Sequence, residues 1–173
     1  MTEKEFFNMV SNGSEDVLRL FLEEVSSAGA NYCVIGGLAV NAYAEPVVSL
    51  DLDVVVAAED IQHVCKVVED HFKVERFAHR INLSSDKSSL RIQIQADPRY
   101  LDFIGKAAFQ TVLGYKMRVA SLEDVLQGKI WAYLDEDRRG SKRQKDLADI
   151  ARLVEAFPDL LARLPDQIRK RLQ

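Results

Sequence analysis

Apolar residues recur along the chain at two spacings, and the spacing predicts which segments form strands and which form helices. Segment 90–95 (LRIQIQ) alternates apolar and polar residues, as a strand with one buried face does. Segment 50–57 (LDLDVVVA) begins with alternation and ends in a continuous apolar run, which is typical of a strand buried on both faces. Apolar positions three and four residues apart predict amphipathic helices over 59–71 and 142–157. The other predicted elements are a helix from Ser14 to Gly29, strands over 32–35 and 72–78, a short helix over 38–44, a hairpin or extended stretch over 111–120 around Gly114, and a helix capped by Ser121 that runs to about Asp135.

The predicted elements divide near Ala120, with strands and helices before it and helices alone after it. We therefore expect an α+β fold in which helices flank a mixed β-sheet, with a C-terminal helical portion. Residues 1–120 would form the α/β core, and residues 121–173 a helical extension packed on it as part of one structural unit. The polar run 84–89 predicts a turn or a mobile loop between two strands.

Composition and charge narrow the range of partners. The 173 residues are 47% hydrophobic and 29% charged, an ordinary globular mixture with enough apolar residues for a core. The formal net charge of −4 gives no overall basic field that would attract nucleic acid without sequence preference. One local run is basic, which is typical of a solvated helix start and is also the best candidate for contacting an RNA or DNA acceptor. The run consists of Arg138, Arg139, Lys142, Arg143 and Lys145.

The two cysteines and the N-terminus indicate a cellular compartment. Cys33 and Cys65 lie far apart in apolar surroundings, with no spacing typical of a zinc site or a redox dithiol. We expect two buried free thiols in a reducing compartment. Residues 1–9 are charged and polar, unlike a signal peptide, and no apolar run approaches the length of a membrane span. A cytoplasmic protein without membrane contact is therefore expected.

A glycine pair and an aspartate pair point to chemistry. Gly36 and Gly37 follow a predicted strand and lead into a helix, so their backbone N–H groups can approach phosphates closely. Asp51 and Asp53 lie two residues apart on one face of a strand, where two carboxylates repel each other unless a cation lies between them. Mg²⁺ or Mn²⁺ suits such a site, because these ions prefer oxygen ligands and often share them with phosphates. A glycine pair alone is usually a tight turn and an Asp-x-Asp alone is often a solvated strand end, whereas the ordered set is more specific.

This arrangement resembles the nucleotidyltransferase superfamily that includes DNA polymerase beta, and in particular its AbiEii-like and small uncharacterised branches. The superfamily signature is G-[GS], a short helix and [ST]-x-D-[IL]-D, which here reads Gly36-Gly37 and Ser49-Leu-Asp-Leu-Asp53. Segment 119–124 (VASLED), followed by Lys129, is similar to V-x-S-L-E-D-L-x-x-x-K in those branches. The resemblance covers about residues 15–155, and its last part is segment 145–150 (KDLADI), similar to K-D-x-x-D-[IL].

The resemblance implies a nucleotidyltransferase fold that transfers a nucleoside monophosphate from an NTP to an acceptor by two-metal chemistry. The acceptor is left open as RNA, protein or a small molecule. A toxin–antitoxin role would add an antitoxin as partner, and a homo-oligomer is a further open alternative. Asp51 and Asp53 would hold the Mg²⁺ or Mn²⁺ ions. Nucleotide binding would fall to Gly36, Gly37, Ser49, Lys129 and Lys145, although a solvated helix face is an equally good interpretation of the two lysines.

One strand position departs from the superfamily pattern. Active members supply a third carboxylate from a later strand, and the matching position here is Gln93, so the catalytic set is expected to be Asp51, Asp53 and Gln93. A glutamine can offer its carbonyl oxygen to a metal ion but cannot act as a general base. Asp97 could substitute for the missing carboxylate only if the chain bends back towards the aspartate pair.

Three functions therefore stay open. The first is a metal-dependent nucleotidyltransferase, and the second is a catalytically degenerate version that acts as a nucleotide-binding or protein-interaction module. The third is a generic α/β protein whose two aspartates are only polar strand residues.

Three further charged residues have expected roles near the site. Arg91 would either point into the same cleft or form a surface ion pair, and Asp146 and Asp149 are expected to cap and pair rather than catalyse.

Overall fold

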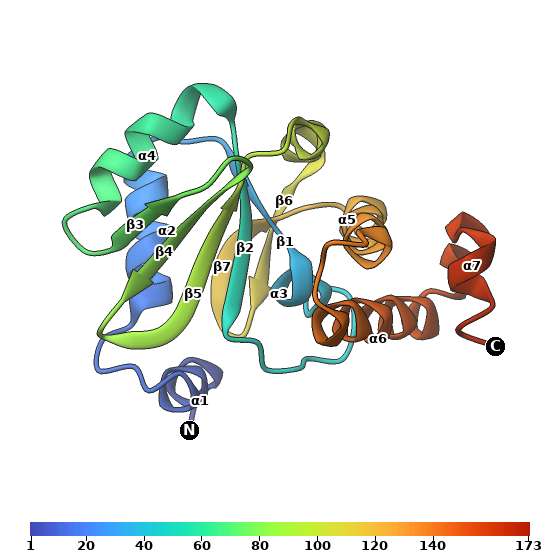
Figure 1. Cartoon of the computed structure of the whole chain (residues 1–173). Coiled ribbons are helices and arrows are strands. Elements are labelled where there is room, and N and C mark those ends of the chain that lie inside the picture. The colour runs from blue at the N-terminus through green and yellow to red at the C-terminus, as the bar shows by residue number, and fades with distance from the viewer.

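One seven-stranded mixed sheet forms the centre of the computed structural model, which describes all residues, 1–173 (Figure 1). Its strands are β1 (Tyr32–Ile35), β2 (Asp51–Val56), β3 (Lys73–Arg76), β4 (Arg80–Ser85), β5 (Ser88–Gln95), β6 (Ala108–Val112) and β7 (Tyr115–Val119). They lie in the order β3-β4-β5-β2-β1-β7-β6. β2 is parallel to β5, β1 is parallel to β7, and the other neighbours are antiparallel. β2, which carries both aspartates of the predicted site, is thus an interior strand.

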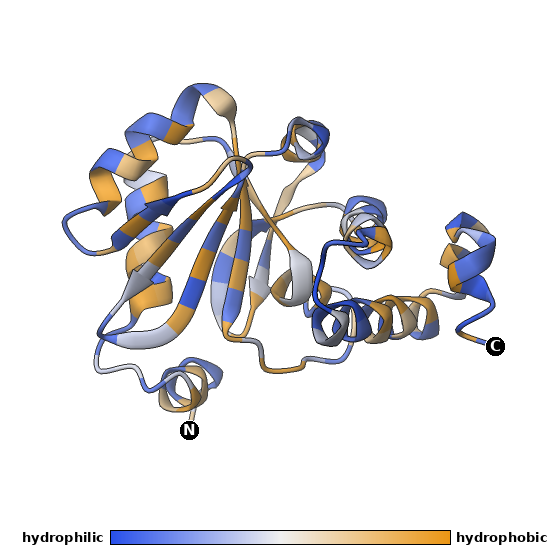
Figure 2. Cartoon of the chain, in the orientation of Figure 1, coloured by the Kyte–Doolittle hydropathy of each residue, from blue (hydrophilic) through white to orange (hydrophobic).

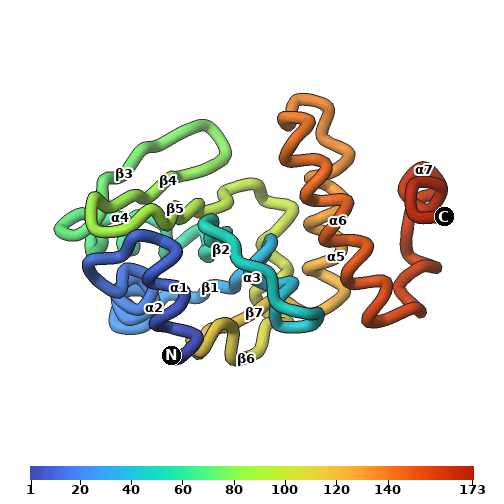
Figure 3. The backbone as a smooth tube through the Cα atoms, turned by 90° about the horizontal axis from the view of Figure 1, so that it is seen from below, coloured from blue at the N-terminus to red at the C-terminus, as the bar shows by residue number.

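Helices lie in two groups beside this sheet. The α-helices are α1 (Glu3–Val10), α2 (Val17–Ser27), α3 (Gly36–Val40), α4 (Ile61–Val68), α5 (Leu122–Leu134), α6 (Gly140–Ala156) and α7 (Asp166–Arg169), and the 3₁₀ helices are η1 (Ala58–Asp60), η2 (Pro98–Lys106) and η3 (Pro158–Arg163). α2 and α4 contact each other beside β3 to β5, whereas α3, α5 and α6 contact one another beside β2 (Figure 1). Figure 3 shows α5 and α6 side by side, with α7 beyond them. The predicted α+β fold, with a mixed sheet and C-terminal helices, is confirmed. None of the helices is long and apolar enough to span a bilayer.

A single apolar core connects the layers. Its 42 buried residues run from Phe7 in α1 to Ile168 in α7. Figure 2 shows hydrophobic and hydrophilic residues alternating along β5, as the LRIQIQ pattern predicts. Cys33 and Cys65 are both buried and free, also as predicted.

The hairpin predicted around Gly114 joins β6 to β7. Val112 pairs with Tyr115, so only Leu113 and Gly114 form the turn, with φ of 50° and 80°. A two-residue turn with two positive φ angles matches the twist of the strands that it connects.

The prediction of a turn or mobile loop over 84–89 is wrong for most of that run. β4 extends to Ser85 and β5 begins at Ser88, so only two residues, 86 and 87, turn. Ser89 N donates to the carbonyl oxygen of Ser11, and Ser14 N donates to that of Lys87. Ser84 pairs with Lys73 of β3 and Ser85 pairs with Ser88, while the N-terminal segment contacts Ser88 and Ser89. The contacts with β3 and with the N-terminal segment join residues distant in the sequence, so they leave no local signal in it.

Helix ends differ from the predicted ones by a few residues. The helix predicted from Ser14 begins at Val17, because the Asp16 side chain caps it by accepting from Arg19 N. Ser121 caps α5 as predicted, accepting from Asp124 N at 3.3 Å. The Asp124 carboxylate pairs with Lys106 at 3.0 Å.

Candidate active site

Asp51 and Asp53 of β2 line a cavity that helices α5 and α6 also line. The apolar residues of this strand, Leu52 and Val54 to Val56, are fully buried, which fixes the strand in the core. Because side chains alternate along a strand, this leaves the two aspartates together on one face. The cavity in front of them has a volume of about 660 Å³.

The structure places every residue of the predicted site around this cavity. Most lining residues come from α3, the segment before β2, β2 itself, β5, α5 and α6, and the rest from β1, η2 and the loop before α6. They include all eight that the sequence singles out: Gly36, Gly37, Ser49, Asp51, Asp53, Gln93, Lys129 and Lys145. Segments far apart in the sequence therefore meet at one concave surface of a size common for small-molecule sites.

Gly36 lies directly against the Asp53 carboxylate. Its φ is +74°, in the left-handed region that favours glycine, and a Cβ at this position would lie 2.3 Å from Asp53 Oδ2. Gly37 has room for a side chain, because a Cβ there would lie 3.7 Å from the nearest atoms, Ser49 Oγ and Asp149 Oδ2. Gly36 thus allows the backbone to approach the aspartate as closely as it does.

Asp53 is a carboxylate without a hydrogen-bond donor or an ion-pair partner, unlike its neighbour Asp51. Burial raises the pKa of Asp53, the positive charge of Lys129 opposes this rise, and the negative charge of Asp51 adds to it. A cation bound beside Asp53 would relieve both the desolvation and the repulsion from Asp51.

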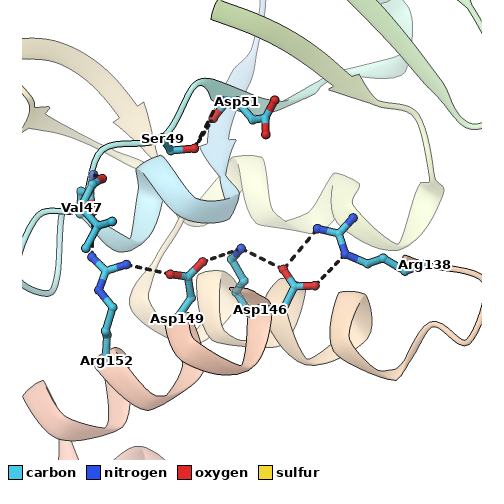
Figure 4. A network of polar contacts seen from close by, with 9 residues as sticks. Val47, Ser49, Asp51, Arg138, Asp146, Asp149 and Arg152 are labelled. Carbon is cyan, nitrogen blue, oxygen red and sulfur yellow. Dashed lines mark hydrogen bonds and ion pairs between the residues drawn. The ribbon is translucent and has the colours of Figure 1, made fainter. Parts of the chain in front are cut away.

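Asp51 is held from two sides. Arg91 on β5 pairs with it through two contacts, Nε to Oδ1 at 2.8 Å and Nη2 to Oδ2 at 3.3 Å. The Ser49 hydroxyl accepts from Asp51 N and donates to Asp51 O, both at 3.3 Å (Figure 4). Both interpretations of Arg91 therefore hold, because it lines the cavity and also forms an ion pair at the surface, where its side chain is 68% exposed.

Lys129 belongs to a buried network of charges between α5 and α6. Its Nζ lies 3.1 Å from Asp146 Oδ1 and 2.8 Å from Asp149 Oδ2. The solvated-helix interpretation is therefore wrong for Lys129, and Asp146 and Asp149 form ion pairs as expected. Arg138 closes one end of the network, with Nε 2.6 Å from Asp146 Oδ2 (Figure 4). Lys145, by contrast, is exposed on α6, lines the cavity and makes no ion pair.

Arg152 was not singled out by the sequence, yet it ties the cavity rim to α6. Its guanidinium contacts Asp149 at 2.7 Å, Asn41 Oδ1 at 2.9 Å and the carbonyl oxygen of Glu45. The Asn41 side chain in turn bonds both N and O of Val47, in the segment that leads to Ser49 and Asp51. The only local signal is the position of Arg152 three residues after Asp149 on one helix face.

Gln93 lies directly beside Asp53, because the two are register partners on the parallel strands β2 and β5. Asp97 does not supply the missing third carboxylate. Its side chain caps η2 and pairs with Arg99 at 3.0 Å, and it does not line the cavity. The structure contains no group of three or more acidic, histidine or cysteine side chains arranged to hold a metal ion.

The donor set fits one divalent cation of the magnesium type. Asp51 and Asp53 supply hard oxygen ligands on one face of β2, and Asp53 is a carboxylate that lacks any other partner. Mg²⁺ is usually bound by one or two carboxylates and by substrate phosphates, so two carboxylates facing a cavity suffice.

Comparison with solved structures shows the same fold in nucleotidyltransferases. The chain is similar to ANT(2″)-Ia in complex with adenylyl-2″-tobramycin, with a TM-score of 0.64 and 16% identity over 91% of this chain and 97% of that one. It is also similar to the lincosamide antibiotic adenylyltransferase LnuA bound to lincomycin, with a TM-score of 0.57 and 15% identity over 82% and 99% of the two chains. A candidate nucleotidyltransferase from Thermotoga maritima gives a TM-score of 0.58 and 18% identity over 86% and 96%.

Sequence comparison identifies the family. No curated protein matches the chain. The family model of the nucleotidyl transferase AbiEii toxin, type IV toxin–antitoxin system, matches residues 20–173, which include every element of the candidate site. The chain therefore belongs to the AbiEii nucleotidyl transferase toxin family.

Proposed function

We propose that the protein is a metal-dependent nucleotidyltransferase that transfers a nucleoside monophosphate from an NTP to an acceptor, as the toxin of a toxin–antitoxin pair. One observation carries the proposal. The unpartnered carboxylate of Asp53 meets the backbone of Gly36 at a cavity that also exposes Asp51 and two lysines without ion-pair partners, Lys142 and Lys145. Carboxylates for a cation and free ammonium groups for phosphates thus face one space large enough for a nucleotide.

Each group has a role that its surroundings support. Asp51 and Asp53 would hold the divalent ion, which supplies Lewis-acid activation and neutralises charge on the phosphates. Gly36 and Gly37 leave their backbone open to the triphosphate, and the Ser49 hydroxyl could turn away from Asp51 O to donate to a phosphate oxygen. Lys145 is free to neutralise phosphate charge, whereas Lys129 contributes its field from within the buried network.

The reaction proposed is an in-line displacement at the α-phosphorus. The acceptor oxygen forms a bond to that phosphorus while the bond to the oxygen that bridges to the β-phosphate breaks. Pyrophosphate leaves with the electron pair of the broken bond, and the proton of the acceptor passes to solvent. Gln93, which adjoins Asp53, can orient the acceptor through its amide but cannot remove this proton.

The acceptor would reach the site through a neighbouring cavity. This second cavity, of about 380 Å³, shares part of its wall with the first, including Gln93, Tyr100 and Arg138. Its outer wall carries Phe77 and Arg99. RNA, protein and small-molecule acceptors stay open, as does a direct contact with an antitoxin.

Transfer of label tests the proposal. Purified protein with Mg²⁺, each of the four α-³²P-NTPs in turn and an extract of nucleic acid and protein should label an acceptor. Asp51→Ala should reduce labelling at least about a hundredfold, because the ion loses half of its protein carboxylates. Asp166→Ala is a matched control, since this aspartate also pairs with an arginine, Arg169 at 3.7 Å, but lies outside both cavities. Labelling that persists in Asp51→Ala would refute the proposal.

A catalytically degenerate nucleotide-binding module is the alternative, and the position of Gln93 beside Asp53 favours it. This alternative predicts that Mg²⁺·NTP binds to the wild-type protein without turnover, and that Gln93→Asp restores turnover. Robust transfer by the wild-type protein would exclude it.

A further inference from the structure

Strand β5 presents a cation and a neutral amide to the aspartate pair. In the parallel register of β2 and β5, Asp51 is opposite Arg91 and Asp53 is opposite Gln93. The row that contains Asp53 and Gln93 continues on β4 with Asn82, a second neutral amide. The strand neighbouring β2 on this side therefore adds positive charge and no negative charge to the site.

Arg91 occupies both oxygens of the Asp51 carboxylate. The two contacts, at 2.8 and 3.3 Å, form the bidentate geometry that a guanidinium matches best. A second ion beside Asp51 would therefore lie next to the guanidinium, whose positive charge repels it. The pairing of β2 with β5 fixes the backbone of Arg91 opposite that of Asp51.

Two divalent ions side by side would be poorly neutralised here. Ions 3.5–4 Å apart, as in two-metal sites, repel each other about four times as strongly as two unit charges at the same distance. Asp51 and Asp53 supply two negative charges, and Arg91 already offsets one of them. The remaining negative charge of the aspartates, together with substrate phosphates, can balance one divalent ion. A second ion would have no carboxylate ligands left.

We propose that the protein side chains hold a single divalent ion, between Asp51 and Asp53, and that the Arg91 guanidinium takes the place of a second ion. The inference rests on the proposed function, because it assigns a stoichiometry to the metal centre of that site. It also gives Arg91 a role as the fixed positive charge on the β5 side of the centre.

Counting bound Mn²⁺ tests the inference without any turnover. Mn²⁺ alone is titrated into the full-length protein, and free Mn²⁺ is measured by its electron paramagnetic resonance signal. The wild-type protein should bind one ion per chain. Arg91→Ala should bind that ion about fivefold more tightly, since an exposed ion pair no longer competes for Asp51. Arg91→Ala combined with Gln93→Asp should bind two ions, because the change adds one carboxylate and removes one cation.

The Arg19→Ala variant is a matched control, since Arg19 also pairs with a carboxylate, that of Glu23 at 2.9 Å, and is 53% exposed, but lies outside both cavities. It should bind one ion with unchanged affinity, and melting temperatures establish that all variants fold. Two ions in the wild-type protein, or unchanged affinity in Arg91→Ala, would overturn the inference and leave the proposed function standing. No bound Mn²⁺ in any variant would overturn both.

Discussion

Gly36 shows how a single residue shapes the candidate site. Its backbone conformation favours glycine, and its missing side chain leaves the space that Asp53 Oδ2 occupies. In the sequence, Gly36 and Gly37 are equal candidates for bringing backbone close to phosphates. The structure separates them, since only Gly36 meets the aspartate so closely.

Gly36→Ala should destabilise the protein more than Gly29→Ala. Both glycines have positive φ, +74° and +65°, so each alanine should cost about 1–2 kcal/mol in backbone strain. At Gly29 no atom lies within 4 Å of the new Cβ, whereas at Gly36 the methyl group would also displace Asp53. Urea unfolding of both variants measures the difference. Equal losses would show that Asp53 moves aside freely and that the close approach is unimportant.

Asp53→Asn should stabilise the metal-free protein at neutral pH. Burial raises the pKa of Asp53, so its charged form is less favourable in the folded than in the unfolded chain. The stability contribution of this group is present below its unfolded pKa, near 3.8, and is lost as the pH rises through the higher folded value. The variant should therefore unfold at higher urea concentration at pH 7, and the advantage should vanish towards pH 3. A variant less stable than the wild-type protein at pH 7 would contradict this account of Asp53.

At the scale of elements, α5 and α6 carry two lysines with opposite roles. Lys129 is buried between Asp146 and Asp149, whereas Lys145 is exposed at the cavity without a partner. The first lysine fixes the helix pair, and the second is available to a ligand.

Lys129→Met and Lys145→Met should separate stability from binding. Lys129→Met should cost about 3 kcal/mol of unfolding free energy, because it leaves buried carboxylates with one partner fewer. Lys145→Met should change stability by no more than about 0.5 kcal/mol but weaken binding of Mg²⁺·NTP about tenfold. Denaturant unfolding and calorimetry of both variants provide the comparison. The reverse pattern would mean that the roles of the two lysines are interchanged.

What the sequence could predict depends on whether the signal is local. β2 and β5 follow from alternation, and the membership of Gly36 and Asp53 in one site follows from a motif with fixed spacing. The register that sets Arg91 against Asp51, and the burial of Lys129, depend on segments about forty and seventeen residues apart. The hydrogen bond from Ser89 to Ser11 is likewise non-local, which is why the start of β5 could not be seen in a polar run of serines.

At the scale of the whole molecule, the cavity lies where the sheet meets the C-terminal helices. Residues 1–120 supply the aspartates and the glycines, and residues 121–173 supply the lysines. A site assembled from both parts requires that they keep a fixed relative position. Trp131 reports on that junction, because its ring stacks on Phe103 of η2 at 5.7 Å and meets Tyr100 edge-on.

The two parts should unfold together. A shared core predicts a single cooperative transition, in which the fluorescence of Trp131 and the far-ultraviolet circular dichroism give the same urea midpoint. Separate midpoints would show that the helical extension is an independent unit.

The central claim is that Asp51 and Asp53 make this cavity a site for a metal ion and a nucleotide. The most direct test is calorimetric titration of Mg²⁺ with the non-cleavable α,β-methylene analogues of the four NTPs into the wild-type protein and into Asp51→Asn combined with Asp53→Asn. At least one analogue should bind the wild-type protein in the presence of Mg²⁺, and the double variant should bind it at least about a hundredfold more weakly. Equal affinity in the two proteins, or no binding of any analogue to the wild-type protein, would contradict the claim.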